Sequence, residues 1–246
     1  MDGKNIPNPG FAADDGSADP ALARALADWS QQQGAAEPAL LAALRQARLM
    51  VPIVALLGEV ETDAAGLKHE KTSDMAVPVI EAADGRRALP AFTSLASLAA
   101  WQADARPAPV NAPQAVMTAY AERADTLLID PAGPVTYQLT GARMRAVAEN
   151  RVWLPPVQDP EVLDALRALL AGEPQVLRAE LTPGGTTDVV LGLEPADGAD
   201  VPALAQRLAA ALAADPVLRV RLTRGLDLAL LPAGARPTGS GFYQAG

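Results

Sequence analysis

The stretch LMVPIVALL at residues 49–57 decides the fold class, because it is a continuous run of aliphatic and β-branched residues. Such a run is typical of a strand that is covered on both faces. Pro52 has no N–H for a ladder, which predicts an edge or a strand start at that point. A helix with Leu40, Leu41 and Leu44 on one face leads directly into this strand. A helix followed at once by a buried strand indicates an α+β domain.

Upstream of this run, residues 1–18 are rich in Pro, Gly, Asp and Asn, which predicts an extended or disordered segment. Asp19 and Pro20 then predict the start of a short helix, with Asp as N-cap and Pro at the first helical position. The next helix is expected to begin near Pro38. Residues 1–35 are therefore expected to form an extended N-terminal segment and a short helix that docks on the body or on a partner.

Turn and cap residues divide residues 36–150, which we interpret as one α+β domain. The turn at Asp84-Gly85 predicts a hairpin. The predicted elements are, in order, a polar loop at 58–74, strands at 75–81 and 87–92, short helices capped by Thr93 or Ser94 and by Asn111, strands at 126–130 and 135–139, and a helix at 141–149. The helix after Asn111 is expected to turn Val116, Met117 and Tyr120 inward.

Residues 151–160 are interpreted as a linker that Pro155 and Pro156 stiffen. Beyond it, the predicted elements are a helix capped by Asp159, strands at 176–181 and 188–193, a helix from Asp200 to just before Asp215, a strand at 226–231 and a Pro/Gly-rich tail at 232–246. This order predicts a smaller C-terminal α+β domain at 161–246. The fold class is thus two small α+β domains, each a mixed or antiparallel sheet with packed helices.

The composition excludes much of the standard catalytic chemistry. The chain has no cysteine and one histidine among 246 residues, so disulfides, thiolate nucleophiles, iron–sulfur clusters and multi-histidine metal sites are excluded. We expect no cofactor and no metal. Alanine accounts for 53 residues, so the chain has fewer large apolar side chains for a core than its 50% hydrophobic content suggests.

The net charge is −9, and the sequence contains no cluster of basic residues. Both observations argue against nucleic acid as a partner. The longest strongly apolar run, residues 51–57, is far shorter than the roughly 20 residues that cross a membrane. The N-terminus lacks the pattern of a signal peptide. We expect a cytoplasmic protein that binds neither nucleic acid nor a membrane.

Four stretches of the larger domain resemble the SseB family of bacteria. They are VPIVALLGEVE at 51–61, KTSDMAVP at 71–78, ALPAFTS at 88–94 and DTLLIDPAGP at 125–134. The stretches KNIPNPGF at 4–11 and DDGSADP at 14–20 resemble the actinobacterial branch of that family. The resemblance implies an N-terminal SseB domain followed by a C-terminal SseB domain. It brings no established catalytic residue, ligand or reaction.

The first candidate binding site is the loop that contains Lys71, Thr72, Ser73 and Asp74. A lysine beside two hydroxyls and a carboxylate could bind an anion or activate the serine. The same side chains also bond readily to neighbouring backbone groups in turns. His69, in the same loop, lacks the second histidine of a zinc-binding helix and is interpreted as a solvated surface residue.

Three further residues complete the candidate set. Arg86 and Arg87 follow the hairpin turn and could grip a carboxylate or phosphate, or flank a solvated hairpin tip. Asp130 begins the stiff connection Asp130-Pro131-Ala132-Gly133-Pro134 and could face a ligand or simply shape the turn.

These observations favour a non-catalytic protein–protein interaction module with a protein partner of unknown identity. Extended segments such as residues 4–18 and the C-terminal tail are suited to docking on another chain. The alternative is a small-molecule or anion sensor, or an atypical hydrolase, built on the 71–74 loop. No residue is assigned a catalytic role.

Overall fold

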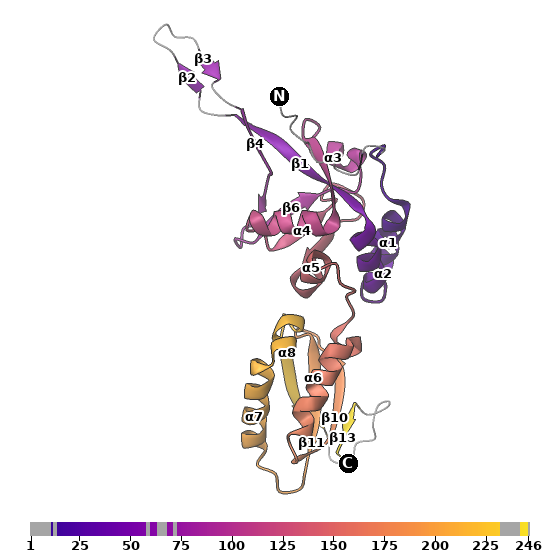
Figure 1. Cartoon of the computed structure of the whole chain (residues 1–246), viewed down its shortest axis with the longest axis vertical. Helices are drawn as coiled ribbons and strands as arrows, with labels where there is room; N and C mark the ends of the chain where they lie inside the picture. Colours follow the sequence, from indigo (N-terminus) through magenta and orange to yellow (C-terminus); the bar gives the residue numbers. More distant parts are fainter. Residues whose placement is uncertain are drawn as a thin grey trace, which may run out of the picture. The chain divides into compact units, whose positions relative to one another are not determined.

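The computed structural model describes residues 11, 14–57, 60–62, 68–70, 73–231 and 242–245, and between residues 55 and 74 it describes the backbone alone. The chain divides into two compact units, Met1–Trp153 and Leu154–Gly246. Both units mix helices with small mixed or antiparallel sheets, so the α+β fold class is confirmed (Figure 1).

The first unit begins with two helices and continues with strands and helices in alternation. Its elements are α1 (Pro20–Gln31), α2 (Gln33–Gln46), β1 (Arg48–Leu57), β2 (Val60–Thr62), β3 (Lys68–Glu70), β4 (Ser73–Ala76), β5 (Ile80–Glu81), β6 (Arg87–Ala91), α3 (Leu95–Trp101), β7 (Arg106–Asn111), α4 (Ala112–Ala121), β8 (Thr126–Ile129), β9 (Tyr137–Thr140) and α5 (Gly141–Ala148). Asp19 caps α1 as predicted, since its carboxylate accepts from the Ala21 and Leu22 N–H groups at 2.8 and 2.9 Å.

Strand β1 organises the sheets of this unit. Its first half pairs antiparallel with β7, and its second half pairs antiparallel with β4. A second sheet has four strands in the order β5-β6-β8-β9, and β6 and β8 are parallel. Met50 and Phe92 exchange two backbone hydrogen bonds of 2.7 and 2.9 Å, which join β1 to the end of β6.

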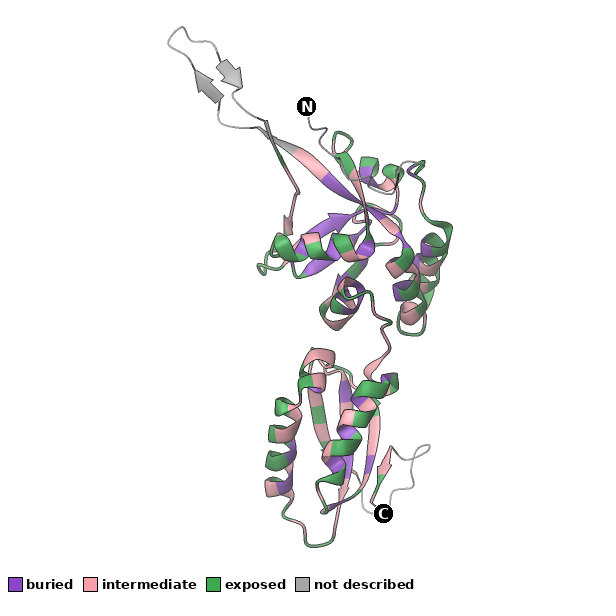
Figure 2. Cartoon of the chain, viewed as in Figure 1, coloured by how far each residue is buried: buried purple, intermediate pink, exposed green. Residues whose placement is uncertain are grey.

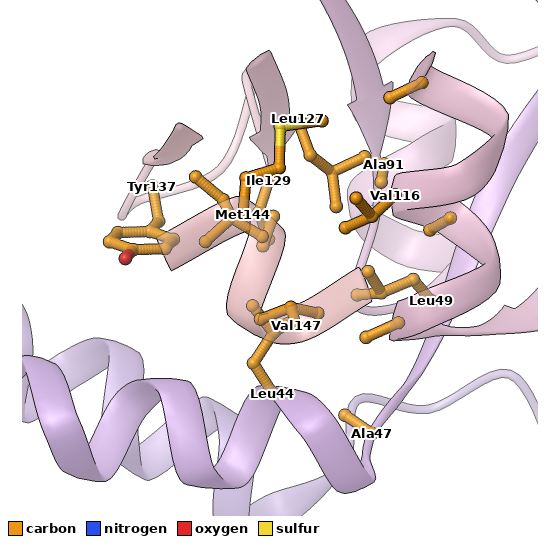
Figure 3. Close-up of a cluster of buried hydrophobic side chains, with 14 of the residues drawn as sticks. Leu44, Ala47, Leu49, Ala91, Val116, Leu127, Ile129, Tyr137, Met144 and Val147 are labelled. Atoms are coloured by element: carbon orange, nitrogen blue, oxygen red, sulfur yellow. The ribbon is translucent and has the colours of Figure 1, made fainter. Parts of the chain in front are cut away.

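The core of the unit lies between these strands and helices α2, α4 and α5 (Figure 2). Figure 3 shows Leu44 of α2, Val116 of α4 and Val147 of α5 meeting Leu49 of β1 and Leu127 of β8. All five side chains are buried. Burying such aliphatic side chains stabilises the fold by about 1.5–3 kcal/mol each.

The orientation predicted for α4 is wrong in part. Val116 is buried, but Met117 and Tyr120 are 57% and 42% exposed. The inward face instead consists of three alanines and Val116, at helical spacing. They are Ala112, Ala115, Val116 and Ala119. Small side chains let this helix approach the strands closely, so alanine forms a core face here although its size suggested otherwise.

A polar cluster fastens the two N-terminal helices to the unit. Tyr137 of β9 donates its hydroxyl hydrogen bond to Glu37 of α2 at 3.0 Å, and Arg143 of α5 contacts the same Glu37 oxygen at 2.5 Å. Trp29 of α1 packs edge-on against the Tyr137 ring, with centroids 5.0 Å apart. Burial raises the pKa of Tyr137 well above its ordinary value, and the neighbouring Glu37 carboxylate adds to the shift.

Several elements of this unit differ from the sequence prediction: the strand predicted at 75–81 is divided into β4 and β5, and β7 was not predicted. Helix α2 begins at Gln33, so Pro38 lies inside it, where one lost hydrogen bond is outweighed by three fully buried leucines further along. Pro52 lies within β1 instead of at its start, opposite Pro107. The polar loop at 58–74 contains the β2–β3 pair and the start of β4.

The second unit has a four-stranded sheet of order β12-β11-β10-β13. Its elements are the 3-10 helix η1 (Pro156–Gln158), α6 (Pro160–Ala171), β10 (Val176–Pro183), β11 (Val189–Pro195), α7 (Val201–Ala214), α8 (Pro216–Arg221), β12 (Leu226–Leu230) and β13 (Tyr243–Gln244). Buried leucines and valines of α6, α7 and α8 form one core with β10 and β11. Strands β11 and β12 are parallel, and the other pairs are antiparallel.

Three elements of this unit are absent from the sequence prediction: η1, which lies in the predicted linker, α8 and β13. Helix α8 carries the same signal as α1 and α6, an Asp N-cap followed directly by Pro. Asp215 accepts hydrogen bonds from the Val217 and Leu218 N–H groups at 2.9 Å. Strand β13 is two residues long and lies in the stretch interpreted as a tail. Among the residues that the structure describes, none of the helices combines the length and apolar character needed to cross a membrane.

Candidate functional site

A hollow of about 430 Å³ opens between α1, α3 and the loop at residues 130–135. Small and apolar side chains make up most of its wall, together with two serines, one threonine and one carboxylate. The lining residues are Ala23, Leu26, Ala27, Thr93, Ser94, Ala96, Ser97, Ala100, Asp130, Ala132, Gly133, Pro134 and Val135. Its volume lies within the range of small-ligand sites.

Asp130, the carboxylate of this hollow, is held in an uncommon backbone conformation. Its φ is +48°, in the left-handed region that few residues other than glycine adopt. Its N–H donates to Ala91 O at 2.9 Å, and its carbonyl accepts from Gly133 N–H at 2.9 Å and from Thr136 Oγ1 at 3.0 Å. A Cβ at Gly133 would lie 3.0 Å from Asp130 Cβ, so a larger residue there would crowd the turn. The loop therefore fixes Asp130 rigidly.

The Asp130 side chain is 6% exposed and is paired with Thr93. The Thr93 N–H donates to Oδ1 at 2.9 Å, and the Thr93 hydroxyl donates to Oδ2 at 2.6 Å. Both carboxylate oxygens of Asp130 thus accept a hydrogen bond from the same residue. These two bonds use one acceptor position on each oxygen, and a carboxylate offers about four in all. Asp130 can therefore accept further hydrogen bonds from an occupant of the hollow.

The other wall of the hollow is the first turn of α3. Ser94 caps this helix, because its hydroxyl accepts a hydrogen bond from the Ser97 N–H at 3.0 Å. In turn, the Ser97 hydroxyl accepts a hydrogen bond from the Ser94 N–H at 3.1 Å. Arg48 of β1 donates to the Thr93 carbonyl at 2.8 Å. Both sides of the hollow are thus fixed by hydrogen bonds from other elements.

Part of the N-terminal segment docks on this wall. Arg48 forms an ion pair with Asp14 at 2.5 Å and donates to the Ser17 carbonyl at 2.6 Å. Leu95 N–H donates to Gly16 O at 2.9 Å, and a Cβ at Gly16 would lie 2.3 Å from Leu95 Cδ1. Residues 14–18 therefore lie on the body of this chain, whereas most of residues 1–13 fall outside the described part.

The structure does not bring Arg86 and Arg87 to this hollow. They lie at the start of β6, and Asp130 follows the far end of the parallel strand β8. Arg86 forms an exposed ion pair with Asp84 at 2.7 Å, which lowers the pKa of that carboxyl. Such an exposed pair contributes little to stability.

The 71–74 loop stays a sequence prediction. Lys71 and Thr72 lie outside the described residues, and Ser73 and Asp74 are described only as backbone, paired with Leu57 and Leu56. Within the described ranges, no group of three acidic or histidine side chains could hold a metal ion.

Sequence reasoning did not single out Thr93 or Arg48 as part of a site. Thr93 was noted only as a helix cap, although Ser94 fills that role. The partners Thr93 and Asp130 are 37 positions apart, and only the parallel pairing of β6 with β8 brings them together. No local sequence signal indicates such a contact.

Together, these features define an α+β protein whose first unit holds a rigid, buried carboxylate beside a hollow with small apolar walls. The model of the SseB protein N-terminal domain matches residues 22–146, and this chain belongs to the SseB family. Every residue that lines the hollow lies within the matched range, and the second unit lies outside it. Comparison with curated proteins, and separately with solved structures, finds no significant similarity.

Proposed function

We propose that the first unit is a non-catalytic binding module that receives a basic side chain of a protein partner in the hollow beside Asp130. The single observation that carries this proposal is the Asp130 carboxylate, fixed by Thr93 and still able to accept hydrogen bonds. A lysine or arginine has an aliphatic stem for the alanine-rich wall and a cationic head for the carboxylate.

Charge supports the same occupant. The chain carries a net charge of −9, which favours the approach of basic partners. A carboxylate inside the hollow also disfavours an anion there. The anion-sensor alternative therefore gains no support from this hollow.

The second candidate function is a sensor of a small molecule with an amino group. It is favoured by the volume of about 430 Å³, which exceeds what a single side chain fills. Such a ligand would use the same carboxylate. A hydrolase built on the 71–74 loop has no further observation in its favour.

The test is selection of random displayed peptides on the full chain, followed by titration of the enriched peptides into the ¹⁵N-labelled protein. We expect the enriched peptides to share a Lys or Arg flanked by apolar residues, and to shift the amide signals of Thr93, Ser97 and Gly133. Replacing the basic residue by norleucine should weaken binding about tenfold or more, because a charge-assisted hydrogen bond is lost.

Two pairs of variants separate the site from the rest of the surface. Asp130→Asn removes the charge but can still bond to Thr93, and Asp104→Asn is its exposed, charge-matched control. Ala100→Trp fills the hollow, and Ala99→Trp places the same side chain on the exposed part of α3 that does not line it. Only Asp130→Asn and Ala100→Trp should weaken binding. Enriched peptides without a basic residue, or no enrichment at all, would contradict the proposal.

Three finer assignments are also proposals. The second unit is proposed as a C-terminal SseB domain, and the chain as a member of the actinobacterial branch. The protein is proposed to act in the cytoplasm. Detection of the full chain in the soluble cytoplasmic fraction of its native cells would test the last of these.

A further inference from the structure

Among the residues that the structure describes, no strand lies on the outer edge of β12 in the second unit. Gly225 O accepts from Asp188 N–H at 3.0 Å, and Leu231 N–H donates to Leu193 O at 2.9 Å, so residues 225 and 231 direct these groups toward β11. Successive residues of a strand alternate in direction. Leu226, Leu228 and Leu230 therefore direct both their N–H and C=O groups away from β11, and within the described residues no strand pairs with them.

The side chains along this edge are apolar and incompletely covered. Leu226 and Leu228 are half-buried and help to line a hollow of about 300 Å³ between α7, α8 and β12. Leu230 is 60% exposed and borders a smaller apolar hollow of about 90 Å³. The edge thus offers hydrogen-bonding groups together with a row of leucines.

Proteins usually protect such an edge with lysine, proline or a bulge. The strand sequence LDLAL contains neither lysine nor proline, and its register with β11 runs from Val189↔Leu226 to Leu193↔Leu230 without a shift. Asp227 and Ala229, the intervening residues, are exposed and small. Asp227 is the one charged side chain of β12, and lysine, proline and a bulge are all absent from this strand.

We propose that the partner of this edge is a second copy of the chain, whose β12 pairs antiparallel with the first about a two-fold axis at Leu228. The pairing joins two four-stranded sheets into one. Leu228 faces its own copy, and Leu226 faces the partner's Leu230. All outward N–H and C=O groups of these leucines are then satisfied, because each facing pair exchanges two hydrogen bonds.

The sequence selects this register over its neighbours. Centred at Leu228, the pairing places Asp227 opposite Ala229 of the second copy. A shift that centres the axis at Asp227 would oppose two aspartates, and like charges directly opposite are destabilising. A shift to Ala229 would oppose Leu226 to Pro232, which has no N–H. The register at Leu228 is free of both faults.

The same register also covers the exposed leucine. Because directly opposed residues of an antiparallel pair point to the same face, the Leu230 side chain of one copy lies beside Leu226 of the other. Leu226 borders the hollow of about 300 Å³, so the most exposed apolar side chain of the edge lies beside this hollow. By symmetry this contact occurs twice.

Sedimentation equilibrium of the full chain over a range of concentrations tests the proposal. We expect a dimer with twice the 25.4 kDa mass of one chain. Leu230→Pro removes an outward N–H but no bond to β11, and Leu230→Lys places a charge in the apolar contact. Each should weaken the dimer about tenfold or more. Val152→Lys, at a side chain that is 59% exposed in the first unit, is the matched control.

A pair of substitutions at Ala229 tests the register itself. Ala229→Lys faces Asp227 of the second copy and should tighten the dimer about threefold or more, whereas Ala229→Asp should weaken it by a similar factor. Circular dichroism establishes that each variant is folded. A monomer at all concentrations, a dimer that Leu230→Lys leaves unchanged, or equal effects of the two Ala229 variants would overturn the proposal.

Discussion

The outer edges of β7 and β12 belong to different units and present opposite chemistry. Met50 exchanges its hydrogen bonds with Phe92, so its neighbours Leu49 and Val51 bond to β7. Their partners there are Val110 and Ala108, which leaves the two intervening prolines, 107 and 109, on the outer side. The edge of β7 has lost its outward donors to proline, while β12 keeps all of its own.

This difference shows how a single residue type can protect an edge at no cost to the ladder. A proline whose missing N–H would face outward removes no hydrogen bond from the sheet. Pro107 and Pro109 occupy such positions in β7, and leucines occupy the equivalent positions in β12. The first edge is closed to another strand, and the second is open to one.

The largest expected change in stability comes from comparing two proline substitutions at adjacent positions of β12, Ala229→Pro and Leu230→Pro. Ala229→Pro removes an N–H that faces β11, so it should destabilise the second unit by about 2 kcal/mol. Leu230→Pro removes an outward N–H and should cost the isolated chain much less. Urea unfolding at low protein concentration, followed by circular dichroism, measures both values.

Equal destabilisation by Ala229→Pro and Leu230→Pro would show that the assigned directions of the backbone groups are wrong. The open edge would then not exist as described. A far larger effect of Leu230→Pro would contradict the account in the same way.

Alkaline pH should lower the stability of the first unit through Tyr137. The unfolding of the unit that contains β7 can then be followed separately from that of the unit that contains β12. Burial raises the pKa of Tyr137 above the ordinary value near 10. In the unfolded chain the phenol loses its proton first, so the stability is complete below pH 10 and declines above it. The decline should approach about 1.4 kcal/mol for each pH unit.

All three tryptophans, at positions 29, 101 and 153, lie in the first unit, so tryptophan fluorescence during urea unfolding reports on it. Tyr137→Phe should lower the stability at pH 8 but flatten its decline above pH 10. An identical slope in the wild type and in this variant would exclude Tyr137 as the cause.

The smallest expected effect is at the protected edge. Pro109→Val adds an N–H to β7 that should face outward, so the stability of the first unit should change by less than about 1 kcal/mol. The new amide should exchange rapidly in hydrogen-exchange mass spectrometry. Strong protection of that amide would mean that position 109 faces β1, against the assignment.

Local chemistry explains which parts of the fold could be predicted from the sequence. Asp19, Asp159 and Asp200 each precede a proline or an apolar helix and cap it as expected, because capping depends on neighbouring residues alone. The prediction for the inward face of α4 was wrong, because it assigned the large residues Met117 and Tyr120 to that face. The small residues Ala115 and Ala119 are buried there instead. Helix α8 was missed although Asp215 carries the same cap signal.

Less of the candidate site than of the fold could be predicted from the sequence. The contiguous turn residues 130–134 predict a stiff connection, in which Asp130 could face a ligand or simply shape the turn. Its partner Thr93, and the alanines of α1 and α3 that complete the hollow, come from distant segments. The pattern LDLAL indicated a strand, but only the sheet order shows that this strand has a free edge.

The open edge of β12 can be tested most directly by hydrogen exchange of individual amides at several protein concentrations. At high concentration the amides of residues 226–230 should all be protected, alternately by the second copy and by β11. On dilution, Leu226, Leu228 and Leu230 should lose protection, while Asp227 and Ala229 keep theirs. Protection of the three leucine amides that does not change with dilution, or that is absent at every concentration, would contradict the account.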